Sequence, residues 1–185
     1  MAYVKWILLA IVAILVASVV HYTLPQTDIV RITDTYEKRV DVGENRLFWS
    51  NASSGFSTSQ PGRDVFFIQT RRDDGDVMVY RNEDTGWGWP PFFKFNTSNL
   101  QAEANDLRST GEAPQWVRLR HYGWRNEMFS IFPNALSVEP IASPAEGKGW
   151  PIGTIVVLTL LVAAIWAVTV RIRRFFARRR ARREA

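Results

Sequence analysis

Two adjacent carboxylates, Glu83 and Asp84, stand just before two tryptophans, Trp87 and Trp89. Glycoside-cleaving enzymes need two carboxylates roughly 5 to 9 Å apart across the scissile bond, and indole faces beside them would stack on sugar rings. Neighbouring residues of an extended chain point to opposite sides, however, so Glu83 and Asp84 are poorly suited to be that pair. A glycosidase would need a further carboxylate, for which the candidates are Glu44 and Glu127.

Few other side chains have catalytic potential. The chain contains two histidines and no cysteine, which excludes disulfides and thiolate chemistry. His21 lies at the outer end of an apolar run, where its ring suits the membrane interface and needs no catalytic role. His121 alternates with Val117 and Leu119, which is the pattern of a buried core histidine. No phosphate loop, nucleophile elbow or zinc motif is present, so the sequence predicts neither a metal site nor a cofactor.

The segment "GWGWPPFFKF", residues 86–95, has five aromatic residues in ten. The rings either cover an open end of the core or stay partly exposed. Exposed rings would stack on a glycan, dip into the outer membrane leaflet or anchor a protein partner, and aromatic side chains near arginine are typical of interface hot spots. The candidate binding residues are Trp87, Trp89, Phe92, Phe93, Arg81 and Arg125.

The basic character of the chain comes from its C-terminus. Residues 171–185 hold eight arginines and one glutamate, a net charge of +7. Residues 26–149 hold 14 Lys and Arg against 17 Asp and Glu, a net charge of −3. Because nucleic-acid-binding domains carry a basic patch themselves, we do not expect the central region to bind nucleic acid.

Two uncharged apolar runs, residues 6–24 and 150–170, bracket the chain. Each is long enough to cross about 30 Å of hydrocarbon as a helix, and aromatic residues near their ends suit the headgroup level. The first run could instead be a cleaved signal peptide, but it lacks a good cleavage site. We therefore expect two transmembrane helices that flank residues 26–149.

The arginines that follow the second run predict the orientation, because positive residues beside a span stay in the cytoplasm. Residues 1–5 and 171–185 are then cytoplasmic, and residues 26–149 are periplasmic. The absence of cysteine from an exported domain favours a bacterial source. The tail either only fixes the topology or also binds anionic lipid or a cytoplasmic partner. The candidate lipid-binding residues are Arg171, Arg173, Arg174, Arg178, Arg179 and Arg180.

Each apolar run also presents small residues at helical spacing. Small side chains let helices approach closely in lipid. Either alanine is simply common in membrane spans, or these faces pack against each other, or one of them docks on another membrane protein or a second copy of the chain. The residues concerned are Ala10, Ala13 and Ala17 in the first run and Thr159, Ala163 and Ala167 in the second.

The 124 residues between the runs are enough for one core. Strands are predicted in "DIVRITDTYEKRVDV", "DVFFIQT", "VMVYRN", "QWVRLRHY", "MFSIF" and "ALSVEPI". Asp74 and Gly75 predict a hairpin turn. A helix should begin at Ser98, with Gln101 completing a capping box, and should bury Leu100, Ala104 and Leu107. We expect a membrane-anchored α+β protein whose domain has five or six strands and one helix, either a partly closed barrel of the oligonucleotide- and oligosaccharide-binding (OB) type or a sandwich.

Three strings carry a family resemblance: "HYTLPQTDIVRITDTYEKR", "VMVYRNEDTGWGWPPFFKFNTSNLQAEA" and "HYGWRNEMFSIFPNAL". They resemble the bacterial membrane family catalogued as domain of unknown function 1523, and the similarity extends over nearly the whole chain. The resemblance implies an inner-membrane protein with no established activity, and it supplies no catalytic or binding residue.

These observations lead to three functional hypotheses. The leading one is a non-enzymatic inner-membrane protein that displays a periplasmic interaction domain as an accessory or assembly component of a membrane complex. The alternative is a membrane-anchored glycan-binding module that uses Trp87 and Trp89, and the third is a glycoside-cleaving enzyme. The partners expected are anionic lipid and another membrane protein or a second copy of the chain; a glycan is the partner under the alternative hypothesis.

Overall fold

The computed structural model describes residues 2–40 and 63–184. The chain divides into two compact units, Met1–Gly149 and Trp150–Ala185. The first contains helix α1 and a β-barrel, and the second is a single long helix, α3. The element bounds are α1 Ala2–Thr23, β1 Gln26–Val40, β2 Arg63–Arg72, β3 Val77–Asn82, α2 Thr97–Asp106, β4 Trp116–Tyr122, β5 Asn134–Ile141, the 3-10 turn η2 Pro144–Glu146, and α3 Ile152–Glu184.

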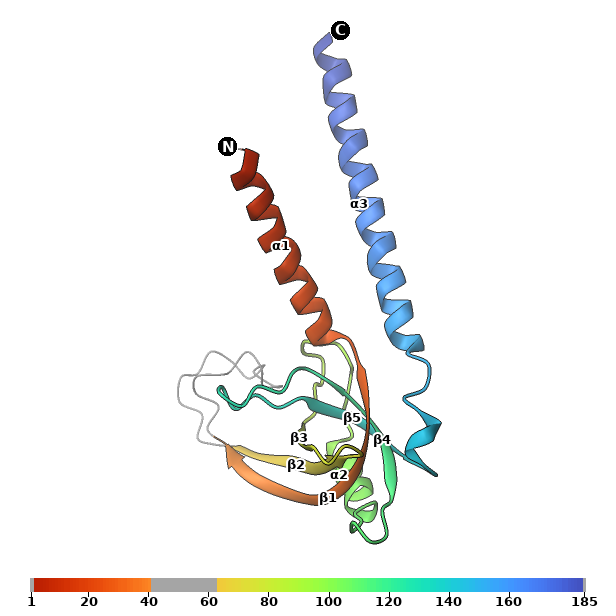
Figure 1. The fold of residues 1–185 in the computed structure, drawn as a ribbon. Coiled ribbons are helices and arrows are strands. Elements are labelled where there is room, and N and C mark those ends of the chain that lie inside the picture. The colour runs from red at the N-terminus through yellow and green to blue at the C-terminus, as the bar shows by residue number, and fades with distance from the viewer. Residues whose placement is uncertain (1, 41–62, 185) are drawn as a thin grey trace. The chain divides into compact units, whose positions relative to one another are not determined.

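The five strands close into a barrel in the order β1-β2-β3-β5-β4, and β4 pairs back onto β1 (Figure 1). All neighbouring strands are antiparallel except β3 and β5, which are parallel. Five strands with one helix between β3 and β4 match the OB type. Of the two architectures expected from the sequence, the barrel is therefore the one observed.

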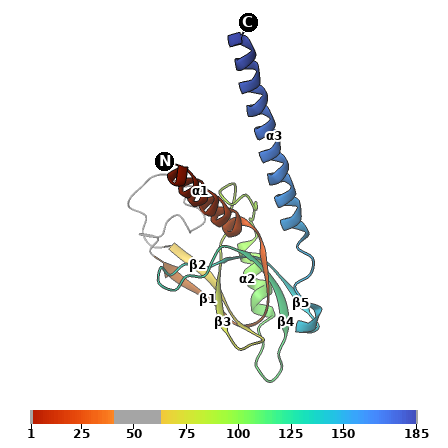
Figure 2. The same ribbon diagram turned by 45° about the horizontal axis from the view of Figure 1, so that its top comes forward.

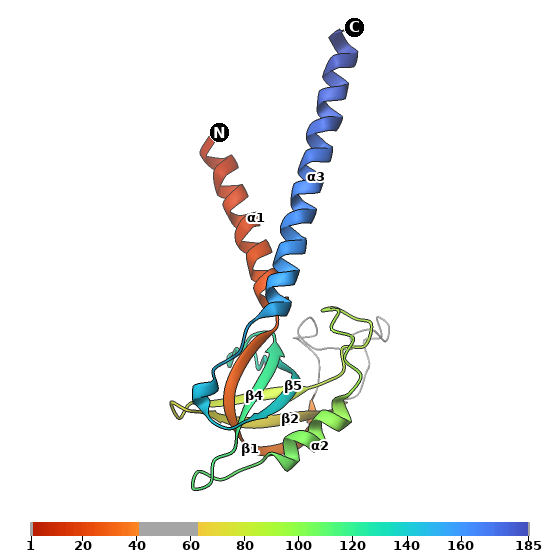
Figure 3. The same cartoon turned by 90° about the vertical axis from the view of Figure 1, so that its right-hand side faces the viewer.

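Alternating side chains fill the barrel. Val30 and Ile32 of β1 and Val117 and Leu119 of β4 are fully buried, as the period of two along a strand requires. Helix α2 contacts β1, β2, β3 and β5 and adds Leu100 and Ala104 to the same core; Leu107, just after its last residue, packs against it. Figure 2 shows the strands arranged around α2 when the barrel is viewed partly along its axis. Figure 3 shows α2 at the end of the barrel remote from α1. The burial predicted for this helix is confirmed.

Strand register defines which segments share the other end of the barrel. Gln26, the first residue of β1, pairs with His121 near the end of β4. Asn134, the first residue of β5, pairs with Tyr122 on one side and with Arg81 near the end of β3 on the other. The start of β1 and β5 and the end of β3 and β4 therefore lie together, and we call this the α1 end of the barrel.

Two local predictions were wrong. Helix α2 begins at Thr97 rather than at a Ser98 cap, and the Gln101 side chain accepts a hydrogen bond from Asn82 Nδ2 at 3.0 Å instead of closing a capping box. The segment "MFSIF" is a turn rather than a strand, because Asn126 and Ile131 pair across it. The strands that the sequence predicted elsewhere, and the hairpin turn at Asp74-Gly75, are confirmed.

Two helices are long and apolar enough to cross a membrane. The windows Trp6–Thr23 and Ile152–Arg174 have mean hydropathies of 2.2 and 2.5, and neither is buried within the described structure. They suggest a membrane location. Helix α3 continues unbroken through the arginine-rich tail to Glu184.

Candidate functional site

Helix α1 is docked on the barrel. The Gly123 amide donates to the Tyr22 carbonyl at 2.9 Å, and Trp124 Nε1 donates to His21 Nδ1 at 2.8 Å. The Tyr22 ring packs edge-on against Trp124, with ring centroids 5.3 Å apart. The chain turns toward the helix at Gly123, whose φ is +91°. A residue with a side chain would adopt this backbone conformation only with strain. Only two residues, 24 and 25, separate α1 from β1, so the helix and the barrel have little freedom to swing.

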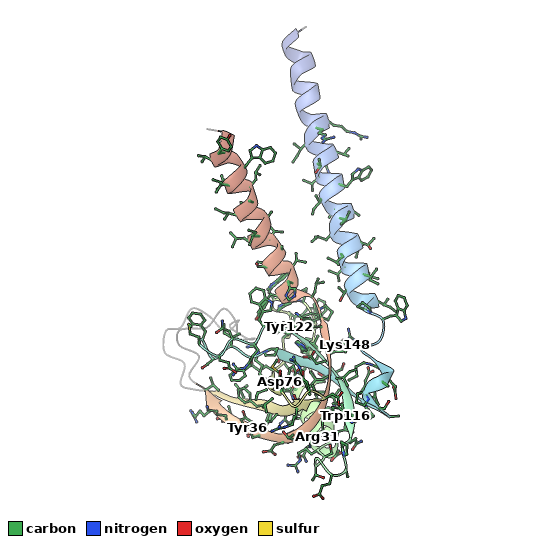
Figure 4. The ribbon with its side chains drawn as sticks, in the orientation of Figure 1. Arg31, Tyr36, Asp76, Trp116, Tyr122 and Lys148 are labelled. Carbon is green, nitrogen blue, oxygen red and sulfur yellow. The ribbon has the colours of Figure 1, made fainter. Side chains whose placement is uncertain are left out.

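Residues 83–96, which we call the aromatic loop, leave the barrel at the same end as this docking point. Phe92 stacks on Tyr122, with ring centroids 4.9 Å apart, and Tyr122 in turn contacts the Tyr22 ring. Figure 4 shows Tyr122 at the α1 end, and Arg31 and Tyr36 toward the opposite side. Figures 1 and 3 show the loop rising to the level at which α1 joins the barrel. The aromatic loop therefore flanks the end of α1.

Hydrogen bonds close the neck of the aromatic loop. Thr85 is 1 % exposed, and its hydroxyl accepts from the Lys94 amide at 3.1 Å. The Gly86 amide donates to the Lys94 carbonyl at 3.1 Å, and the Gly88 amide donates to the Thr85 carbonyl at 2.9 Å. A side chain at Gly88 would crowd that carbonyl, because its Cβ would lie 3.1 Å from the oxygen. The loop is thus a closed turn with a tight base.

Lys94 fixes this base to the barrel. The residue is 6 % exposed, and its ammonium donates to Asn82 Oδ1, to the Glu83 carbonyl at 3.1 Å and to Thr97 Oγ1 at 3.4 Å. Burial lowers the pKa of the Lys94 ammonium to about 8, although the neighbouring carboxylates of Asp84 and Glu83 raise it. One buried cation therefore ties the end of β3 to the start of α2 and holds the loop between them.

The rings of the aromatic loop point outward. Trp87 is 84 % exposed, Trp89 69 %, Phe95 59 % and Phe93 53 %. Trp87 contacts Phe93 and Phe95 edge-on, with centroids 5.3 and 6.0 Å apart. The sequence left two interpretations of "GWGWPPFFKF" open. These four side chains do not cover the core, so for them the partly exposed arrangement is the one observed. Phe92 differs, because it is half-buried against Tyr122.

Arg81, a candidate binding residue, is not at the surface. It is 2 % exposed, and its Nη1 lies 3.2 Å from Glu83 Oε2. Asn134 is fully buried beside the pair; it accepts from the Glu83 amide at 2.9 Å and donates to the Glu83 carbonyl at 3.0 Å. Arg81 therefore stabilises the interior of the α1 end and cannot contact an external ligand directly.

The two adjacent carboxylates also have structural partners. Glu83 pairs with Arg81 as described, and Asp84 Oδ1 accepts from the Thr97 amide at 3.0 Å and from the Thr97 hydroxyl at 2.8 Å. Asp84 thus supplies the first turn of α2 with the acceptor that Asn96, at the N-cap position, does not provide. Of the carboxylates suggested as their catalytic partners, Glu127 lies 3.8 Å from Arg125 Nη2 and Glu44 lies outside the described residues.

Arg125, the other candidate arginine, belongs to the turn between β4 and β5. Its guanidinium lies over the Phe132 ring, 4.3 Å from the centroid, and donates to the Ile131 carbonyl at 3.0 Å. These contacts hold the turn rather than the aromatic loop. The same turn exposes Met128 and Phe129, which are 85 % and 53 % exposed.

A second buried polar group centres on Asp28 in the barrel interior. Asp28 Oδ2 accepts from the Tyr80 hydroxyl at 2.6 Å and from Arg72 Nη2 at 3.1 Å, and it lies 3.2 Å from His121 Nε2. Lys148 Nζ lies 3.4 Å from the other oxygen. Burial alone would raise the pKa of Asp28, but the contacts with His121 and Tyr80 and the charge of Arg72 hold it well below its usual value.

The pKa of the Tyr80 hydroxyl is held well above 10 by burial and by Asp28. Arg72, His121 and Lys148 surround the one carboxylate of Asp28, so this buried charge is paired. The predicted burial of His121 is confirmed at 5 % exposure. Its Nδ1 has no hydrogen-bond partner among the residues that the structure describes. No group of three or more metal-binding side chains occurs within residues 2–40 and 63–184.

The candidate residues of the spans are exposed. Ala10, Ala13 and Ala17 are exposed along α1, and Thr159, Ala163 and Ala167 are exposed along α3. The Thr159 hydroxyl donates to the Ile155 carbonyl at 2.8 Å, so its polarity is satisfied within the helix. Arg171, Arg173 and Arg174 are exposed on α3, whereas the side chains of Arg178, Arg179 and Arg180 lie outside the described ones.

Sequence reasoning missed the two residues that organise the α1 end, Lys94 and Trp124. Lys94 carried a weak signal as the one charged residue among residues 86–95, since a lone charge in an apolar segment often has a buried partner. Trp124 gave none, because its bond to His21 joins residues 103 positions apart. Asp28 was likewise indistinguishable from the other acidic residues of the predicted strands.

One family model matches most of the chain. The profile of the family described as "Protein of unknown function (DUF1523)" matches residues 1–176. An uncharacterized protein of Haemophilus influenzae is 40 % identical over 159 residues, which cover 86 % of each chain. No solved structure matches.

Proposed function

The chain belongs to the family described as "Protein of unknown function (DUF1523)", and we propose from its geometry that it is a non-enzymatic accessory or assembly component of a membrane complex. In this proposal both apolar helices cross the cytoplasmic membrane, both termini are cytoplasmic, and the barrel is displayed in the periplasm. The arginines at the end of α3 support that orientation through the positive-inside rule.

The docking of α1 on the barrel carries the proposal. The contacts of Tyr22 with Gly123 and of His21 with Trp124 hold the barrel at the end of the candidate span Trp6–Thr23. A domain that searches for soluble ligands gains reach from a long linker, whereas this one is held at the membrane surface. Its most accessible partners are therefore proteins of the same membrane.

The chemistry of the described residues supports a non-enzymatic role. Glu83 and Asp84 are engaged by Arg81 and Thr97, and His121 is buried beside Asp28. These contacts give Glu83, Asp84 and His121 structural roles within the barrel that need no substrate. The small-residue face of α1 is exposed and suits close contact with a helix of a partner.

A photo-crosslinking residue at Ala13, on that face, tests the proposal in cells. Leu15 lies on the opposite face of α1 and is the matched control, since both positions are at the same depth in the span. We expect an adduct of defined mass from Ala13 and none from Leu15, and its mass distinguishes a different protein from a second copy. Equal or absent crosslinking from both positions would contradict a partner on this face.

The exposure of Trp87 and Trp89 favours a second candidate, a membrane-anchored glycan-binding module. Indole faces stack on sugar rings, and two rigidly held indoles would form a platform. Soluble cell-wall oligosaccharides should then change the tryptophan fluorescence of the wild-type chain and leave that of a Trp87→Leu, Trp89→Leu variant unchanged. Fluorescence that is insensitive to the oligosaccharides in both chains would exclude this candidate.

A further inference from the structure

We propose that the aromatic loop inserts its exposed rings into the headgroup region of the outer membrane leaflet and so binds a lipid surface. The inference rests on the membrane insertion of α1 in the proposed function but not on any protein partner. Lipid contact would cover the four aromatic side chains of this loop that are otherwise exposed to water.

The position of the loop is the first argument. Strand register puts the end of β3, where the loop begins, at the same end of the barrel as the start of β1, where α1 enters, with β5 and β4 between them. Phe92, Tyr122 and Tyr22 form a continuous line of ring contacts between the loop and the last turn of α1. That turn lies at the end of the candidate span, at the depth where headgroups begin.

The chemistry of the loop surface is the second argument. Residues 86–95 contain glycine, proline, tryptophan, phenylalanine and one lysine. That lysine, Lys94, is 6 % exposed and points its ammonium into the barrel. Residues 86–95 therefore present only aromatic and proline side chains to their surroundings, and the indole N–H groups are the only polar atoms of those side chains. A glycan site would need hydrogen-bonding groups beside the indoles, and protein hot spots commonly include polar anchors.

Tryptophan is the residue type that best suits a membrane interface, because its ring is apolar and its N–H can bond to headgroups or water. Trp87 and Trp89 are the two most exposed rings of the loop. Trp124, which is 37 % exposed and contacts the Tyr22 ring, adds a further indole beside the last turn of α1.

Rigidity is the third argument. The neck bonds of Thr85 and the buried Lys94 fix the base of the loop, and Trp87 packs edge-on against Phe93 and Phe95. Rings that are fixed in an outward position lose little conformational entropy when they enter lipid. With the docking of α1, this loop gives the barrel a second attachment and fixes its tilt on the membrane.

Spin labels at single cysteines test the inference directly, because the natural chain contains no cysteine. Trp89→Cys reports on the loop. Glu112→Cys is the matched control, since it is exposed and precedes the start of β4, at the end of the barrel remote from α1. The labelled chains are placed in nanodiscs of phosphatidylethanolamine and phosphatidylglycerol, and collision with oxygen is compared with collision with a water-soluble nickel complex.

We expect the label at position 89 to collide preferentially with oxygen and to be shielded from nickel, and the label at position 112 to show the reverse. A Phe95→Cys label should behave like that at position 89. Equal nickel accessibility at positions 89, 95 and 112 would overturn the inference. This sample contains only the chain and lipid, so that result would not bear on the protein partner of the proposed function. The crosslinking experiment at Ala13, in turn, does not test the lipid contact of the loop.

Discussion

Replacement of Lys94 by methionine isolates the cost of burying a charge under the aromatic loop. The folded-state pKa of the Lys94 ammonium is about 8, against 10.5 for an ordinary lysine. Between these values the unfolded chain binds more protons than the folded one, so the stability of the wild-type barrel rises as pH rises through this window. Below pH 8 the buried charge costs a constant amount, about 3 kcal/mol from the difference of the two pKa values.

The measurement is the free energy of unfolding of the full chain in detergent micelles, from denaturant titrations at several pH values. From about pH 7 to 9.5 the wild-type barrel should gain about 2 kcal/mol relative to the Lys94→Met variant. The variant itself leaves buried acceptors such as Asn82 Oδ1 without a donor, a loss of about 1–3 kcal/mol that does not depend on pH and that opposes the gain from removing the buried charge.

Lys38→Met is the matched control, because Lys38 is exposed on β1. This variant should keep the wild-type dependence on pH. If wild type and Lys94→Met show the same change of stability with pH, the ammonium is not buried as described, and the account of how the loop is held fails.

Three further predictions concern individual contacts. Asp28→Asn should cost on the order of 2 kcal/mol by weakening a buried ion cluster. Because the folded-state pKa of Asp28 is depressed, the stability of the wild-type chain should fall as pH drops below about 3.8. Acid titrations of the variant should lack that loss. Asp84→Ala should cost about 1 kcal/mol by removing the acceptor of the first turn of α2, whereas Asn96→Ala should be close to neutral, since Asn96 makes no side-chain capping bond; equal effects in denaturant titrations would refute this assignment. Trp124→Phe should cost about 1 kcal/mol by removing the bond to His21, and an unchanged midpoint of thermal unfolding would show that the bond contributes nothing.

The barrel was largely predictable because its strands alternate or are rich in β-branched residues. The period-two pattern of Val117, Leu119 and His121 indicated their common face, and that face is buried. Asp74 and Gly75 indicated the β2–β3 turn for a local reason, since a positive φ is needed there and Gly75 has 91°. Strand pairing beyond neighbours, such as β4 on β1, depends on contacts that no local pattern encodes.

The errors arose where a distant residue replaced a local one. Asp84, 13 positions before Thr97, accepts from the Thr97 amide and hydroxyl and so caps the first turn of α2, a role that the sequence assigned to Ser98. In "MFSIF" the alternation was misleading, because Asn126 Oδ1 accepts from the Phe129 amide and stabilises a turn. The exposure of Trp87 and Trp89 could not be decided from sequence, since it depends on Lys94 holding the loop from inside.

The central claim is that the barrel is fixed to the end of α1 at the membrane surface. Double electron–electron resonance between spin labels at Ile11→Cys in α1 and Glu112→Cys on the barrel measures this in nanodiscs. The account predicts one narrow distance distribution, which broadens when Trp124→Ala removes the docking contact with His21. A broad distribution in the otherwise wild-type chain would mean that the barrel is only tethered to its helix, and it would contradict the account.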